Sequence, residues 1–345
     1  MTRVALAMGL VAWVPALASA GPAAYLQKPD DWFASPEARA IAANVLAHQA
    51  DLGGWPKNID TTKPFTGDRT QIKPTFDNSA TTDELRFLAR IHNATRDEKY
   101  RTAFEKGLDY ILKAQYANGG WPQSHPPGTG YHRHITFNDN AMVRLMELVR
   151  EVATSNRYDF LDADRRKACR AAFDRGIECI LKCQIKVDSK LTAWCAQHDE
   201  KDLAPRPART YELVSLSGSE SVGIVRLLMS LDRPSPEVAR AIDGAVAWFQ
   251  SAKLEGTKVV VERDPKYPGG RERVVVKDPK APPLWARFYE IGTNRPIFSD
   301  RDGIKKYALA EIGPERRNGY AWYGTWPRDL LEKEYPGWKK KLARP

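Results

Sequence analysis

Apolar residues recur along the chain with the spacing of amphipathic helices, and one helix is repeated four times. Each copy ends in a glutamine, and these glutamines follow one another at nearly equal intervals. The predicted helices are Glu37–Gln49, Thr102–Gln115, Ala171–Gln184 and Ala241–Gln250. The pattern therefore indicates an internal structural repeat.

A second amphipathic helix fits into each interval between these copies. The apolar spacing predicts it at Thr82–Ile91, Ala141–Val149 and Val222–Met229. A helical hairpin cannot cover its own apolar face, so tandem hairpins pack against one another. We therefore expect an all-α dominated fold in the form of an α/α toroid or barrel.

The only strong strand pattern follows the last repeat. Val259–Val261 and Val274–Val276 flank the turn sequence Tyr267–Gly270, which predicts a small β-hairpin insertion. No segment poor in apolar residues divides the rest of the chain. We expect one catalytic domain over residues 21–345.

Residues 1–20 have the features of a signal peptide. Arg3 precedes an apolar run, and Ala18-Ser19-Ala20 is a small-x-small cleavage site. The run is too short for a membrane span, and no later segment is sufficiently apolar. We expect an exported protein, secreted or periplasmic, with no membrane partner.

The net charge of +10 is spread over the whole sequence. Such a balance predicts a positive surface or cleft for an anionic partner. An exported protein rarely meets nucleic acid, so an anionic polysaccharide is the expected partner of a monomer. The net charge therefore predicts the class of ligand and says nothing about the fold.

Four cysteines lie close together in the sequence: Cys169, Cys179, Cys183 and Cys195. In an oxidising compartment they favour one or two disulfides over a metal site, because the paired CxxC spacing of a zinc ribbon is missing. Buried free thiols stay open as an alternative. The six histidines show no spacing typical of a metal cluster.

A tryptophan follows the end of the first three copies. Gly53-Gly54-Trp55 and Gly119-Gly120-Trp121 share one offset, and Trp194 holds a similar place. Diglycine ends a helix, and an exposed tryptophan there would form the wall of a sugar cleft. The other interpretation is a helix cap whose tryptophan closes the core.

Acidic residues precede two of the inner helices. Thr75–Asn78 and Thr136–Asn140 place Asp77 and Asp139 at equivalent helix ends, on one rim of a toroid. A capping box of Thr81 and Glu84 would leave Asp77 and Asn78 free. The two carboxylates then fit either a Ca²⁺ site or the acid and base of a glycoside hydrolase.

Arg209 and Glu212 lie in the loop before the next inner helix. They form either a structural ion pair or part of a reactive centre. Arg287 and Arg301, among aromatic residues near the end, would suit carboxylate recognition, although each alone is typical of a surface ion pair.

These segments together resemble the pectate lyases of polysaccharide lyase family ten. The resemblance extends from Asp51 to Pro327, and its motifs are GGWPKN (53–58), TFDN (75–78), GGWPQ (119–123), TFNDNA (136–141), LTAWCAQHD (191–199), PARTYE (207–212), SGSES (217–221), WARFYE (285–290) and PIFSDRDG (296–303). It implies an (α/α)₃-type helical toroid. It also implies Ca²⁺-dependent β-elimination of polygalacturonate to 4,5-unsaturated oligogalacturonides.

Residue roles follow from the same resemblance. Arg209 becomes the Brønsted base, Asp77 and Asp139 the calcium ligands with Asn78 beside them, and Arg287 and Arg301 the ligands of substrate carboxylates. Ca²⁺ and these two arginines would disfavour the charged form of Arg209, so we expect an alkaline pH optimum. A hydrolase that uses Asp77 and Asp139, or a polyuronate-binding protein without activity, stay as alternatives.

Overall fold

The computed structural model describes residues 21–342. The predicted signal peptide lies outside these residues. Within them, no helix combines the length and the apolar character that crossing a membrane requires.

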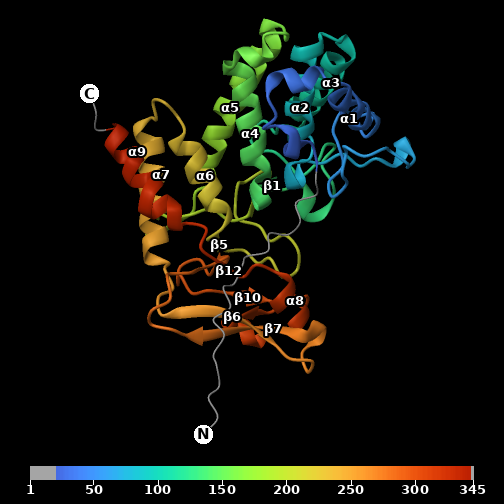
Figure 1. Cartoon of the computed structure of the whole chain (residues 1–345). Coiled ribbons are helices and arrows are strands. Elements are labelled where there is room, and N and C mark those ends of the chain that lie inside the picture. The colour runs from blue at the N-terminus through green and yellow to red at the C-terminus, as the bar shows by residue number, and fades with distance from the viewer. Residues whose placement is uncertain (1–20, 343–345) are drawn as a thin grey trace.

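Helical hairpins form the upper part of the described structure (Figure 1). The inner helices α2, α4 and α6 pack against the outer helices α3, α5 and α7, respectively. The bounds are α1 Pro36–Ala47, α2 Thr82–Thr95, α3 Glu98–Ala114, α4 Ala141–Thr154, α5 Ala163–Cys183, α6 Glu220–Met229 and α7 Pro236–Ser251. The predicted repeat of paired helices is confirmed, and closure of the pairs into a toroid stays a prediction.

The glutamine at the end of each copy joins that copy to the next. Gln49 Nε2 donates to Gly53 O in its own loop and to Ala103 O in α3, both at 2.8 Å. In the same way, Gln184 Nε2 donates to Thr192 O in its own loop and to Ala241 O in α7. Gln250 ends the last copy and is exposed. Gln49 and Gln184 are buried, and Gln115 makes the same pair of bonds, to Gly119 O and Ala172 O, while half-buried.

The tryptophans close the core, so the helix-cap interpretation is confirmed and the alternative of an exposed sugar-binding wall is wrong. Trp55, Trp121 and Trp194 are fully buried. Each indole N–H donates to a carbonyl in the last turn of the preceding outer helix, as Trp121 does to Ile111 O at 2.9 Å. Trp285 does the same for α7, at Phe249 O. Helix ends leave such carbonyls unpaired, which explains why an indole is placed there.

The diglycine before each tryptophan allows the loop to approach the next outer helix closely. Gly119 has a φ of +92°, and a Cβ there would lie 2.1 Å from Arg175 O in α5. Only glycine fits such a position. The turn therefore brings the loop directly against the next outer helix.

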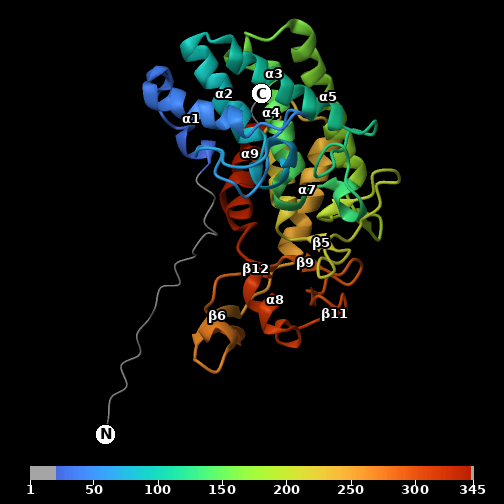
Figure 2. The same ribbon diagram turned by 90° about the vertical axis from the view of Figure 1, so that its right-hand side faces the viewer.

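The C-terminal part forms a lobe below the helices, as Figures 1 and 2 show. Its predicted hairpin is confirmed, with β6 at Thr257–Arg263 and β7 at Arg271–Lys277. The lobe also contains α8 (Pro314–Gly319), and the chain then returns to α7 through a π-helical turn, Leu330–Glu334, and α9 (Tyr335–Leu342).

Pairs of two-residue strands tie the loops together, and all are antiparallel. The pairs are β1 (Ile135–Thr136) with β4 (Gln197–His198), β2 (Lys186–Val187) with β3 (Lys190–Leu191), β5 (Leu216–Ser217) with β9 (Phe288–Tyr289), β8 (Trp285–Ala286) with β12 (Tyr323–Gly324), and β10 (Phe298–Ser299) with β11 (Lys305–Lys306).

The predicted disulfides are wrong, because all four cysteines are free and buried. Cys169, Cys179 and Cys183 lie on α5, and Cys195 lies in the loop after it. Burial raises the pKa of Cys169 to about 12. These thiols behave as small apolar side chains of the core.

Candidate active site

The N-terminal ends of α2, α4 and α6 meet because each loop hydrogen-bonds the next. Phe76 N donates to Gln123 O, Phe137 N to Ala196 O and Gly218 N to Arg287 O, each at 2.9 Å. The three acceptors each lie two residues after a buried tryptophan. The repeat therefore places three equivalent loops around one polar cavity.

Four of the predicted residues line this cavity: Asp77, Asn78, Asp139 and Arg209. Residues predicted from three separate repeats therefore lie around one cavity. Glu212, which the sequence paired with Arg209, also lines it, and so do Lys57 and Gln123, which were not singled out from the sequence as site residues.

Two similar 3₁₀ turns carry the acidic residues. In Asp77–Ser79 and in Asn138–Asn140 the second residue is left-handed, with φ of 52° at Asn78 and 51° at Asp139. Asp77 thus corresponds to Asn138, and Asn78 to Asp139. The aspartates lie at equivalent helix ends, as predicted, but one position apart. Asp77 is buried, whereas the side chain of Asp139 is 41% exposed.

Asp77 has one oxygen that is paired and one that is not. Its Oδ2 accepts hydrogen bonds from Lys57 Nζ and from Gln123 Nε2, the latter at 2.9 Å. Among the described residues, Asp77 Oδ1 is buried without a partner, and so is Gln123 Oε1. Buried acceptors normally have a donor or a cation. Carboxylate and amide oxygens are the ligands that Ca²⁺ prefers, so this donor set fits that ion.

Asp139 is backed by a buried arginine. Arg287 Nη2 lies 3.4 Å from Asp139 Oδ1 and also donates to Glu220 Oε1. Burial alone would lower the pKa of Arg287, but Glu220 together with the other acidic groups around the guanidinium outweighs it and keeps the pKa above its usual value. Arg287 therefore lies behind Asp139, already paired with two carboxylates of the protein.

Arg209 reaches the cavity as half of an ion pair. Its Nε donates to Glu212 Oε2 at 2.8 Å, and the Tyr320 hydroxyl donates to Glu212 Oε1 at 2.6 Å. The Glu212 hydrogen bonds raise the pKa of Arg209 above its usual value. We expected nearby cations to lower this pKa. In the described residues Glu212 dominates because it contacts the guanidinium directly.

Arg301 lies apart from the other candidates. It is exposed, and its Nε and Nη2 bind Glu315 at 3.1 and 3.0 Å. It is not among the residues that line the cavity. Its fork is the geometry that a substrate carboxylate would use, but a carboxylate of the protein holds it here.

One signal for the missed residues was present in the sequence. Lys57 and Gln123 each follow a repeat tryptophan by two positions and contact Asp77, just as the predicted Arg287 follows Trp285 by two positions and contacts Asp139. Tyr320 gave no such signal. Its ring lies between two arginines, 5.7 Å from Arg209 Cζ and 4.9 Å from Arg287 Cζ.

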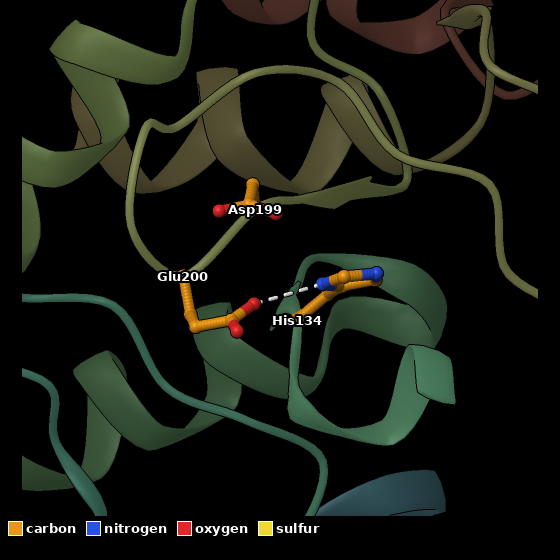
Figure 3. A group of neighbouring side chains, drawn as sticks. All are labelled: His134, Asp199 and Glu200. Atoms are coloured by element: carbon orange, nitrogen blue, oxygen red, sulfur yellow. Dashed lines mark hydrogen bonds and ion pairs between the residues drawn. The ribbon is translucent and has the colours of Figure 1, made fainter. Parts of the chain in front are cut away.

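A second polar group lies at the other end of the β1–β4 pair. One potential metal-ligand atom from each of His134, Asp199 and Glu200 lies within 4.8 Å of the other two, which is the spacing of a possible metal site (Figure 3). His134 Nδ1 lies 3.0 Å from Glu200 Oε2, and Arg206 Nε donates to Asp199 Oδ2 at 2.9 Å. Although burial opposes it, backbone N–H donors and Arg206 lower the pKa of Asp199 to about 2. Donors of the protein already neutralise these carboxylates, which favours an ion-pair cluster.

Comparisons with a family model and with solved structures agree with this geometry. The family model described as pectic acid lyase matches residues 49–331. A family 10 polysaccharide lyase from Cellvibrio cellulosa is 35% identical, with a TM-score of 0.78, over 93% of this chain and 98% of that chain. A mutant of such a lyase from the same organism, in complex with trigalacturonic acid, is 34% identical, with a TM-score of 0.77, over 94% and 97%.

A search of curated proteins found no match. Two findings identify the family. The family model matches over the repeats, the cavity and most of the C-terminal lobe, and two solved structures share 34% and 35% of their residues with this chain. On these grounds the chain belongs to the pectic acid lyase family of polysaccharide lyases.

Proposed function

We propose that this protein is a pectate lyase that cleaves α-1,4-linked polygalacturonate by Ca²⁺-dependent β-elimination. The observation that carries the proposal is the convergence of Arg209, Asp77 and Asp139 on one cavity of a pectic acid lyase. The substrate class is supported by the relative that binds trigalacturonic acid. The net charge of +10 suits the same polyanion.

Asp77 and Asp139 would hold the ion, with the unpartnered Oδ1 of Asp77 as its first protein ligand. When bound, Ca²⁺ supplies Lewis-acid stabilisation of the charge that develops on a uronate carboxylate. Asn78 lies beside Asp77 in the left-handed position of the turn and would bind a sugar hydroxyl or carboxylate.

Arg209 acts as the Brønsted base in this proposal. Its neutral guanidine accepts the proton from C5, the C5–H electrons form the C4=C5 double bond, and the C4–O bond breaks. The leaving oxygen takes a proton from water. Because Glu212 stabilises the charged guanidinium, Arg209 has to shift away from Glu212 before it reacts. An alkaline working pH favours the neutral form.

Arg287 and Arg301 would bind substrate carboxylates. For Arg301 this requires an exchange of Glu315 for a uronate, which the exposure of both side chains permits. Arg287 has less freedom, because it is buried between Glu220 and Asp139. We also propose export after removal of residues 1–20, and action as a monomer.

The test is ultraviolet absorbance of the unsaturated product during incubation with polygalacturonate. We expect a Ca²⁺-dependent rise that a chelator stops and that Arg209→Ala abolishes. Arg233→Ala removes an exposed arginine between α6 and α7 and should retain full activity. New reducing ends without absorbance would assign Asp77 and Asp139 to a hydrolase. Binding without either product would indicate a non-catalytic polyuronate-binding protein.

A further inference from the structure

Lys57 is the cation that contacts Asp77 in the described structure. Its Nζ bonds Asp77 Oδ2, and 40% of its side chain is exposed in the cavity that Arg209 also lines. It belongs to the loop after α1, held by the buried Trp55. A lysine contacts a carboxylate through a single nitrogen on a flexible stem. Lys57 can therefore leave Asp77 without a change in the backbone.

The other side of Asp77 is arranged for a second cation. Asp77 is 4% exposed and Gln123 is 7% exposed, yet within residues 21–342 neither Asp77 Oδ1 nor Gln123 Oε1 has a hydrogen-bond partner. The two side chains are fixed to each other by the 2.9 Å bond from Gln123 Nε2 to Asp77 Oδ2. Adjacent side chains thus leave two buried oxygen acceptors that a cation could use.

We infer that Lys57 is the exchangeable counter-ion of Asp77: it neutralises the carboxylate in the absence of a divalent cation, is released when the cation binds, and then binds a uronate carboxylate of the substrate. This inference rests on the proposed function and adds a residue to it. The ammonium and a divalent cation on one carboxylate repel each other, so binding of the one disfavours the other.

The released ammonium has a second use within the cavity. Asn58 and Asn78 line the same cavity wall as Lys57, and Asn78 Nδ2 donates to Asn58 Oδ1 at 3.0 Å. A uronate that reaches the cavity brings a carboxylate close to this wall, where the ammonium can pair with it. The exchange would thereby couple cation loading to substrate binding.

Calorimetric titration of Ca²⁺ into the full chain, without substrate, tests the exchange. For Lys57→Met we expect a dissociation constant about tenfold lower than for the wild type, because the competing charge is gone. Lys57→Arg keeps the charge and should stay near the wild type. Lys63→Met removes an exposed lysine of the same loop and controls for long-range charge.

The exchange is overturned if Lys57→Met binds Ca²⁺ no more tightly than Lys63→Met, or if no variant binds Ca²⁺. A thermal melt of each variant checks that it is folded. Kinetics then test the second role: at saturating Ca²⁺, Lys57→Met should raise KM for polygalacturonate several-fold while kcat stays within about twofold. An unchanged KM would show that Lys57 does not bind the substrate carboxylate.

Failure of the proposed function gives a different result. Absence of unsaturated product from the wild type would reject the lyase, whatever the calorimetry shows. Unsaturated product together with equal Ca²⁺ affinities of the wild type and Lys57→Met would reject only the exchange.

Discussion

Glu212 holds the guanidinium of Arg209 through both carboxylate oxygens, while the Tyr320 hydroxyl fixes one of them. Arg209 N also donates to Glu212 Oε2, at 3.1 Å. The proposed base is therefore oriented by the same contact that keeps it protonated. Orientation and basicity oppose each other at this residue.

The substitution Glu212→Gln separates these two effects. Loss of the carboxylate lowers the pKa of Arg209, because its hydrogen bond to Glu212 is the main cause that raises it. A base has to be neutral, so the rate rises with pH up to that pKa. We expect the rising limb of the pH–rate profile to move to lower pH, while kcat falls at least tenfold through lost orientation.

The measurement for Glu212→Gln is the pH at which the rising limb of the pH–rate profile lies, and the size of kcat is not the test. An unchanged limb with lower kcat would mean that Arg209 does not act as the base. A wild-type optimum near pH 5 would exclude the alkaline mechanism as a whole.

The repeat glutamines provide a test of the fold. Gln184 is buried and bonds two carbonyls, whereas Gln250 is exposed at the equivalent place. Gln184→Ala leaves Thr192 O and Ala241 O unpaired and should lower the free energy of unfolding by about 2 kcal/mol. Gln250→Ala should change it by less than about 0.5 kcal/mol. Equal losses in urea denaturation would contradict this assignment.

Repetition explains how much of the site the sequence predicts. Asp77, Asp139 and Arg209 precede corresponding inner helices, and corresponding helix ends meet when hairpins pack in order. The one-position offset between the aspartates depends on the left-handed φ of Asn78 and Asp139. A left-handed residue other than glycine is not readable from a sequence of Asp and Asn, since both tolerate either conformation.

The contacts of the arginines could not be predicted for a different reason. Arg287 pairs with Glu220, and Tyr320 contacts Glu212, across long stretches of chain. Those contacts depend on how the C-terminal lobe packs below the helices. The tryptophans were ambiguous because diglycine precedes a buried indole and an exposed one equally well.

The assignment of Trp121 to the core predicts a graded loss of stability. Trp121→Phe retains most of the burial but leaves Ile111 O unpaired, which costs about 1 to 2 kcal/mol. Trp121→Ala also opens a cavity, and we expect a loss of about 3 to 5 kcal/mol. Urea denaturation measures both. A Trp121→Ala protein with wild-type stability and a raised KM would instead support the sugar-binding wall.

Two buried groups should give the stability opposite dependences on pH. Burial lowers the pKa of His198 from 6.5 to about 4. Neutral His198 accepts from Cys195 N at Nε2 and bonds Leu203 O through Nδ1. Burial raises the pKa of Glu84 from 4.5 to about 7. Glu84 accepts from Thr81 N in the predicted capping box, which is present.

Between pH 4.5 and 6.5 the two contributions have opposite signs. The unfolded chain binds a proton at His198 that the folded chain does not, so this group makes stability rise with pH. The folded chain binds a proton at Glu84 that the unfolded chain does not, so this group makes stability fall with pH. Each slope approaches about 1.4 kcal/mol per pH unit. The two groups therefore nearly cancel in the wild type.

Single variants should reveal each slope in urea denaturation at a series of pH values. Glu84→Gln leaves the histidine term, so its unfolding free energy should rise relative to the wild type from pH 4.5 to 6.5. His198→Gln leaves the glutamate term and should show the reverse. Both variants lose hydrogen bonds and some stability at every pH, so the difference in slope is the result that counts. Parallel curves for all three proteins would show that neither group titrates as its burial requires.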